Sequence, residues 1–119
     1  MFKFMENLDE WIDRVNASGI SIIVEGKKDV SALKKIGIKN SMFCLSVKPI
    51  YKVAEDFKAR EVIILTDFDK KGKELYGKLS TELQSQGVRI DRTFREWLQR
   101  NTKLSHIEGL DNYYYRANQ

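Results

Sequence analysis

The chain has 119 residues, of which 42% are hydrophobic and 32% charged, and its formal net charge is +4. These values suit one folded domain and exclude a disordered chain or two separate cores. No apolar run approaches the roughly 18 residues of a membrane span, and residues 1–6 lack the apolar block of a signal peptide, so we expect a cytoplasmic protein with no membrane partner.

The first half of the chain alternates between helical and extended hydrophobic periods. Apolar side chains at helical spacing run as far as Gly19, and a short apolar strand follows that glycine. Gly37 and Pro49 mark further helix boundaries. The elements predicted here are a helix over 3–18, a strand over 21–25, a helix over 28–36, a strand over 41–45 and a helix that begins near Pro49.

The second half continues this alternation. Residues 61–66 give the clearest strand of the chain, and a long amphipathic helix then extends to Gln86. Predicted beyond it are a short strand over 88–90, a helix around Trp97, a packed segment near Ile107 and Leu110, and a C-terminal tail over 109–119. With no repeat or linker in the sequence, we predict a single domain over 1–119, with a core of about 20–108.

Strands that alternate with helices predict a particular fold class. They favour right-handed βαβ units, and hence a mainly parallel sheet. We therefore expect an α/β, Rossmann-like three-layer sandwich in which helices cover both faces of a mainly parallel four-stranded sheet. Ligands of such sheets bind beyond the carboxyl ends of the strands, where the strand order reverses. A 2-1-3-4 order would bring the ends of the first and third strands together.

Acidic side chains follow these two strands. Glu25 ends the first, and Asp67 and Asp69 end the third. Three carboxylates in a partly dry site repel one another at a cost of several kcal/mol, unless a cation or a proton offsets it. The two aspartates share one face of an extended backbone, about 6–7 Å apart, so both can bind one ion.

The ligand types indicate which ion. The chain has one cysteine, Cys44, so it holds no Cys/His zinc cluster and no internal disulfide. Carboxylate oxygens favour Mg²⁺ or Mn²⁺ over zinc, and Mg²⁺ usually completes its shell with water and phosphate oxygens. Lysines follow both acidic motifs, and we interpret them as phosphate contacts, although each alone is also typical of a solvated surface: Lys27, Lys28, Lys70, Lys71 and Lys73.

Two motifs together resemble a known family. The first is the run Ile22–Val30, which contains strand, Glu25, Gly26 and Asp29, and the second is the run Ile63–Gly72, which contains strand, Asp67, Asp69 and Gly72. A lone D-x-D is weak, but the pair at this spacing is similar to the Toprim domain. That module is shared by bacterial-type primases, type IA and type II topoisomerases, OLD-type nucleases, recombination-mediator proteins and a ribosomal-RNA-maturing ribonuclease.

The resemblance covers residues from about 21 to about 90 and is nearest to the primase and maturase versions. It implies that Glu25 is the general acid or base, and that Asp67 and Asp69 hold Mg²⁺, with Glu25 as a further metal residue. The chain resembles a small stand-alone Toprim protein of the archaeal kind. No second domain is expected to supply a topoisomerase tyrosine or a primase template surface, so neither full activity is predicted.

Other motif residues have two interpretations each. Asp29, one turn into a helix, either joins the site or caps backbone N–H groups. Gly26 and Gly72 either form turns or let backbone approach phosphate. His106 more readily fits a surface or packing role than a catalytic one. The run Tyr113–Tyr115 favours docking against the domain over stacking on unpaired bases.

Two functions from different classes follow. The first is Mg²⁺-dependent nucleic-acid phosphodiester chemistry, most simply cleavage of RNA or DNA. The second is a non-catalytic Toprim module that binds nucleic acid or a protein partner, with a homodimer as one possibility. The complete acidic set favours chemistry. A D-x-D-x-T phosphatase fits less well, because Lys70 and Lys71 follow Asp69 where that motif requires other residues.

Overall fold

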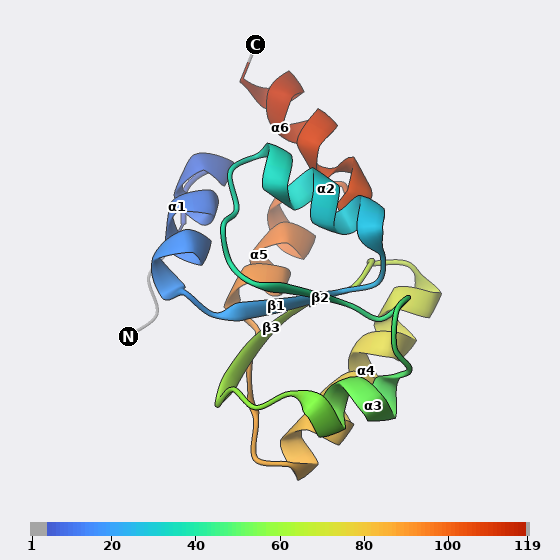
Figure 1. Cartoon of the computed structure of the whole chain (residues 1–119). Coiled ribbons are helices and arrows are strands. Elements are labelled where there is room, and N and C mark those ends of the chain that lie inside the picture. Colours follow the sequence, from blue (N-terminus) through green and yellow to red (C-terminus); the bar gives the residue numbers. More distant parts are fainter. Residues whose placement is uncertain (1–4, 119) are drawn as a thin grey trace.

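The computed structural model describes residues 5–118, and its elements form an alternating series. Figure 1 shows them in chain order. Their bounds are α1 Leu8–Ser18, β1 Ser21–Val24, α2 Lys27–Lys35, β2 Met42–Cys44, α3 Ile50–Asp56, β3 Glu61–Leu65, α4 Lys70–Ser85, β4 Arg89–Asp91, α5 Thr93–Asn101, the 3-10 turn η1 Ile107–Gly109 and α6 Leu110–Ala117.

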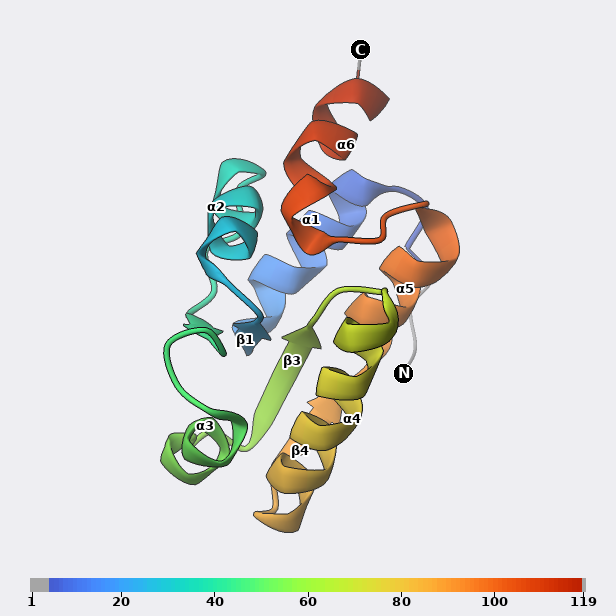
Figure 2. The same cartoon turned by 90° about the vertical axis from the view of Figure 1, so that its right-hand side faces the viewer.

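The sheet is parallel throughout and has the order β2-β1-β3-β4. Alternate strand residues face opposite layers, as expected for a sheet covered on both sides. Ile22 and Ile63 pack with α1, α2, α5 and α6, whereas Ile23 and Ile64 pack with α3 and α4. Figures 1 and 2 show these two helical layers on either side of the strands. The predicted three-layer α/β sandwich and its strand order are confirmed.

The ends of the chain differ in detail from the predicted elements. The N-terminal helix predicted over 3–18 begins at Leu8, because the Asn7 side chain accepts a hydrogen bond from the Glu10 N–H and caps it there. Residues 3 and 4 of that prediction lie outside the described residues. Met5 precedes the helix and is nevertheless buried in the core.

The segment predicted as a tail over 109–119 contains helix α6, with residue 119 outside the described part. Leu110 anchors this helix in the core. The Tyr114 hydroxyl contacts Asp9 and the Tyr115 hydroxyl donates to the Lys35 carbonyl, 3.0 Å away. The tyrosine hydroxyls thus dock α6 on α1 and α2. Because only one apolar side chain of this helix is fully buried, its sequence pattern is weak.

Membrane spans are absent from the described helices. None of the helices within residues 5–118 has both the length and the apolar composition needed to cross a bilayer. The longest, α4, carries lysines and glutamates among its 16 residues.

Candidate functional site

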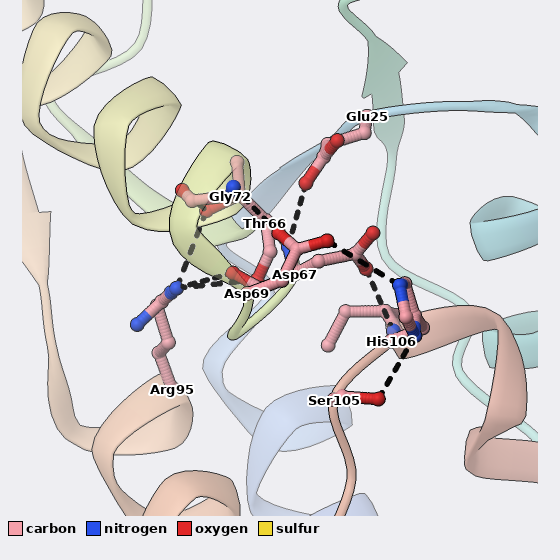
Figure 3. A network of polar contacts seen from close by, with 9 residues as sticks. Glu25, Thr66, Asp67, Asp69, Gly72, Arg95, Ser105 and His106 are labelled. Atoms are coloured by element: carbon pink, nitrogen blue, oxygen red, sulfur yellow. Dashed lines mark hydrogen bonds and ion pairs between the residues drawn. The ribbon is translucent and has the colours of Figure 1, made fainter.

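The carboxyl ends of β1 and β3 lie side by side and carry the acidic motifs. Val24 pairs with Leu65 in the parallel ladder, so the residues that follow them leave the sheet at the same edge. The Glu25 carboxylate reaches across this edge, and its Oε2 accepts a hydrogen bond of 2.7 Å from the Asp67 N–H (Figure 3). The two motifs that the sequence separates by about forty residues therefore meet directly.

Each of the three predicted acids is anchored through one oxygen. Glu25 uses Oε2 on the Asp67 amide, and Asp67 uses Oδ1, which accepts from the Ile107 N–H at 2.8 Å. Asp69 uses Oδ1 to cap α4, accepting from the Gly72 N–H at 2.7 Å. The second oxygens of Glu25 and Asp67 have no hydrogen bond from residues 5–118, and that of Asp69 lies beside the His106 ring. Carboxylates that are fixed through one oxygen in this way are well suited to hold a cation with the other.

A buried arginine side chain contacts the loop that carries Asp67 and Asp69, which we call the aspartate loop. Arg95 on α5 is only 7% exposed, and its guanidinium donates to the carbonyls of Asp67 at 2.8 Å and Thr66 at 3.3 Å. It also stacks between Phe68 and Tyr76, with its Cζ 4.6 and 4.7 Å from the ring centroids. Burial lowers the pKa of Arg95 from its usual value. The sequence did not predict this role, because a single arginine within a helix has no distinctive pattern.

Gly72 is fixed by crowding. A Cβ on Gly72 would lie 2.0 Å from the Asp67 carbonyl oxygen, so only glycine lets the first turn of α4 pack on this loop. The Thr66 hydroxyl donates to the Gly72 carbonyl at 2.8 Å and ties strand β3 to the same turn. Gly72 is buried, which indicates that its role is to let the aspartate loop pack closely and not to let backbone approach phosphate.

Gly26 and Asp29 form the other junction, between β1 and α2. Asp29 Oδ2 accepts from the Gly26 N–H at 3.0 Å and so caps the helix, although Asp29 is only 6% exposed. The pKa of Asp29 is raised to about 6, chiefly by burial and against the opposing effect of this hydrogen bond. The negative charges of Asp67, Glu25 and Glu108 contribute to the same rise. A Cβ on Gly26 would meet nothing within 4 Å, so this glycine leaves open space beside Glu25.

His106 joins the aspartates from the segment before η1. Its Nε2 lies 3.3 Å from Asp69 Oδ2, and its Nδ1 lies 2.9 Å from Ser105 Oγ (Figure 3). Within residues 5–118, Asp67, Asp69 and His106 form a group whose ligand atoms all lie within 4.8 Å of one another. Glu25 is outside that group, so its role as a metal ligand stays a prediction. The sequence favoured a surface or packing role for His106 over a catalytic one, and its side chain is half exposed at the rim of this group.

The five predicted lysines surround this edge. Lys27 and Lys28 begin α2, and Lys70, Lys71 and Lys73 lie in the first turn of α4. All five are exposed, and none forms an ion pair within 4 Å with a carboxylate of residues 5–118. The N-termini of both helices also carry partial positive charge. The edge thus combines acids that suit a metal with cations that suit an anionic ligand.

The fold and the site together define a class of domain. It is a parallel α/β domain with an acidic cluster beyond the ends of β1 and β3. The family model of the Toprim domain matches residues 19–94, which contain all four strands of the described sheet and helices α2, α3 and α4. The chain therefore belongs to the Toprim domain family, whose members bind divalent metal and act on or with nucleic acids.

Particular relatives extend this likeness beyond the matched segment. A UPF0292 protein of Methanocaldococcus jannaschii is 32% identical over 118 residues, which cover 93% of this chain and 92% of that protein. A UPF0292 protein of Pyrococcus abyssi is 38% identical, with 89% and 83% covered. A solved structure of a protein from Aquifex aeolicus superposes with a TM-score of 0.79 at 37% identity, covering 87% of this chain and 98% of that one. The chain is thus similar to small Toprim proteins of archaea.

Proposed function

We propose that the protein carries out Mg²⁺- or Mn²⁺-dependent phosphodiester chemistry on nucleic acid, most simply the hydrolytic cleavage of RNA or DNA. The supporting observation is that the two oxygens of each acidic side chain have different surroundings. Glu25, Asp67 and Asp69 each accept a hydrogen bond from a backbone N–H with one oxygen, and the second oxygens lie at the same edge of the sheet, that of Asp69 beside His106 Nε2. Such preorganisation is what a metal-assisted site requires.

The residues take separate roles. Asp67 and Asp69 would hold the cation, since their carboxylate oxygens suit Mg²⁺ and Mn²⁺. When bound, that cation polarises a phosphoryl oxygen and neutralises developing charge. Glu25, with one oxygen held by the Asp67 amide, has its other oxygen available to accept a proton from the attacking water or return one to the leaving oxygen.

The lysines and the two helix N-termini would bind the substrate backbone. Phosphates are attracted by exposed ammonium groups and by the free N–H groups at a helix start. Lys27 and Lys28 on one side and Lys70 and Lys71 on the other are exposed and have no carboxylate within ion-pair distance among the described residues. A backbone that crosses the edge would therefore contact both pairs and pass over the acids.

The alternative is a Toprim module that binds nucleic acid, or a protein partner, without chemistry. The exposed lysines support this alternative as much as they support cleavage, because they would bind nucleic acid in both cases. The acids argue against it, since carboxylates with free oxygens repel phosphate and would weaken a site that only binds.

A cleavage assay separates the two functions. The protein is incubated with a mixture of structured RNAs and DNAs in Mg²⁺ or Mn²⁺, beside Glu25→Gln, the double variant Asp67→Asn/Asp69→Asn, and Glu82→Gln. Glu82 is exposed on α4 away from the acidic edge and serves as the matched control. We expect cleavage by wild type and the control and none by the other two, with Glu25→Gln still binding the probes. Binding without cleavage by wild type would favour the module, and cleavage that survives in Glu25→Gln would point to a contaminating nuclease.

Metal binding is tested without any substrate. Millimolar Mg²⁺ or Mn²⁺ should raise the melting temperature of wild type, because a ligand bound only by the folded state stabilises it. The double variant Asp67→Asn/Asp69→Asn should lose that rise. An equal response in both proteins would exclude the aspartates as the metal site.

A further inference from the structure

We propose that His106 is a third protein ligand of the cation held by Asp67 and Asp69, which makes the centre a mixed nitrogen and oxygen site with a preference for transition-metal ions over Mg²⁺. This inference rests on the metal site of the proposed function. One ring nitrogen of His106 and one oxygen of each aspartate lie within 4.8 Å of one another, and Nε2 is 3.3 Å from Asp69 Oδ2. Ligands on opposite sides of an ion bound at about 2.1 Å are about 4.2 Å apart, so a small side-chain movement brings all three onto one ion.

The backbone on both sides of His106 is held against the aspartate loop. The Phe68 N–H donates to the Ser105 carbonyl at 2.8 Å, and the Ile107 N–H donates to Asp67 Oδ1 at 2.8 Å. These two bonds involve the residues immediately before and after the histidine. The imidazole therefore faces the aspartates because of tertiary contacts of its own segment, and its position does not depend on the 3.3 Å contact with Asp69 alone.

Ser105 supports one ring orientation. Its Oγ lies 2.9 Å from His106 Nδ1, which directs Nε2 to Asp69. When Nδ1 carries the proton and donates it to Ser105, Nε2 keeps the lone pair that a metal ligand needs. Histidine ligands in proteins are commonly fixed in this way, with the second ring nitrogen bonded to a neighbour. The serine is thus a positioning residue for the imidazole.

A nitrogen ligand changes which ions the centre prefers. Imidazole suits transition-metal ions, whereas Mg²⁺ is bound almost entirely by oxygen. Loss of the imidazole should therefore weaken Mn²⁺ binding more than Mg²⁺ binding. His106 is about half exposed, so its replacement leaves the core intact.

The test uses Mn²⁺ as a paramagnetic probe on the full chain without a histidine tag. His106 is the only histidine of the sequence, so any imidazole nitrogen signal in the electron spin-echo spectrum of bound Mn²⁺ comes from it. We expect that signal in wild type and in Glu25→Gln, its loss in His106→Gln, and a fall in Mn²⁺ affinity of about tenfold in His106→Gln with a smaller fall for Mg²⁺. Ser105→Ala should keep the signal with a weaker Mn²⁺ affinity.

The outcomes separate this inference from the metal site itself. Mn²⁺ that binds wild type but not Asp67→Asn/Asp69→Asn, and shows no imidazole nitrogen signal, would overturn the histidine ligand and leave the site in place. Tighter metal binding by His106→Gln would likewise overturn it, since the imidazole would then be a cation paired with Asp69. Absence of Mn²⁺ binding, or equal binding by wild type and the double aspartate variant, would remove both proposals.

Discussion

The two junctions that carry the acidic motifs are built alike and constrained differently. In each, an acid follows a buried parallel strand and exposed lysines begin a helix, with a glycine close by: Gly26 comes before the lysines of α2, and Gly72 comes after the first two lysines of α4. The junction from β1 to α2 is held by the hydrogen bond from the Gly26 N–H to Asp29 and by remote bonds that Glu25 accepts from the Asp67 and Ser46 N–H groups, and it has open space at Gly26. The junction from β3 to α4 is packed without space at Gly72.

The second junction also depends on distant parts of the chain. Arg95 from α5 holds its carbonyls, and the Ile107 N–H holds the Asp67 carboxylate. The difference teaches that the loop of Asp67 and Asp69 is fixed by close packing as well as by remote contacts, whereas the Glu25 junction is held by hydrogen bonds, carries a buried acid in Asp29 and has open space at its glycine. Four predictions test this contrast, from the largest expected effect to the smallest.

The two glycines give the largest contrast. Gly72→Ala places a Cβ against the Asp67 carbonyl, and we expect it to lower the free energy of unfolding by about 3 kcal/mol or more. Gly26→Ala meets open space and an extended backbone, so its effect should stay within about 1 kcal/mol. Denaturant unfolding of both variants measures the difference. Equal loss of stability in the two would mean that the junctions are constrained alike.

The buried arginine is the next largest. Arg95→Met removes two charge-assisted hydrogen bonds to the aspartate loop and leaves its carbonyls unpaired, which should cost about 2–3 kcal/mol. It should also weaken Mn²⁺ binding, since the loop that presents Asp67 loosens. Arg100→Met, on the exposed side of α5, is the matched control and should stay within about 0.5 kcal/mol. Unchanged metal affinity in Arg95→Met would show that the loop holds its shape without the arginine.

The contrast also explains what the sequence predicted and what it did not. Strand order, the shared edge of Glu25 and Asp67, and the three-layer fold follow from local periods and from the rules of parallel sheets. Arg95 and His106 were not predicted as functional, because their contacts depend on how α5 and the η1 segment pack, and a single polar residue in either gives only a weak local signal. Helix α6 was likewise obscured, since its tyrosines dock through hydroxyl contacts.

Asp29 gives a smaller effect of opposite sign. Its pKa of about 6 in the fold lies above the roughly 3.9 of an unfolded aspartate, so its contribution to stability is full below pH 4 and is lost as the pH rises through 6. Asp29→Asn keeps an oxygen for the Gly26 N–H and removes the charge. In metal-free buffer it should stabilise the protein by about 1–2 kcal/mol at pH 7.5 and hardly at all at pH 4.

Melting curves across this pH range, with EDTA present, test the prediction. Asp13→Asn is the control, because Asp13 is exposed on α1 and should change stability little at any of these pH values. A loss of stability in Asp29→Asn at pH 7.5 would show that the helix cap outweighs the charge repulsion. The β1 junction would then be constrained by structure, as the β3 junction is.

The lysines give the smallest effect on each side and compare the junctions as binding surfaces. Affinity falls as salt rises, and each backbone phosphate contact that is lost should make the slope of log affinity against log salt shallower by about 0.7 to 0.9. Each pair of substitutions should therefore reduce the steepness by at most about 1.8. We compare Lys27→Ala/Lys28→Ala with Lys70→Ala/Lys71→Ala, and use Lys58→Ala/Lys78→Ala, which are exposed outside both junctions, as a charge-matched control. If nucleic acid crosses the edge between the two helix N-termini, both junction pairs should lower the slope alike, for single-stranded and duplex probes, and the control should not. A drop for one pair only would place the backbone over one junction, and a drop equal to that of the control would show that the lysines act only through net charge.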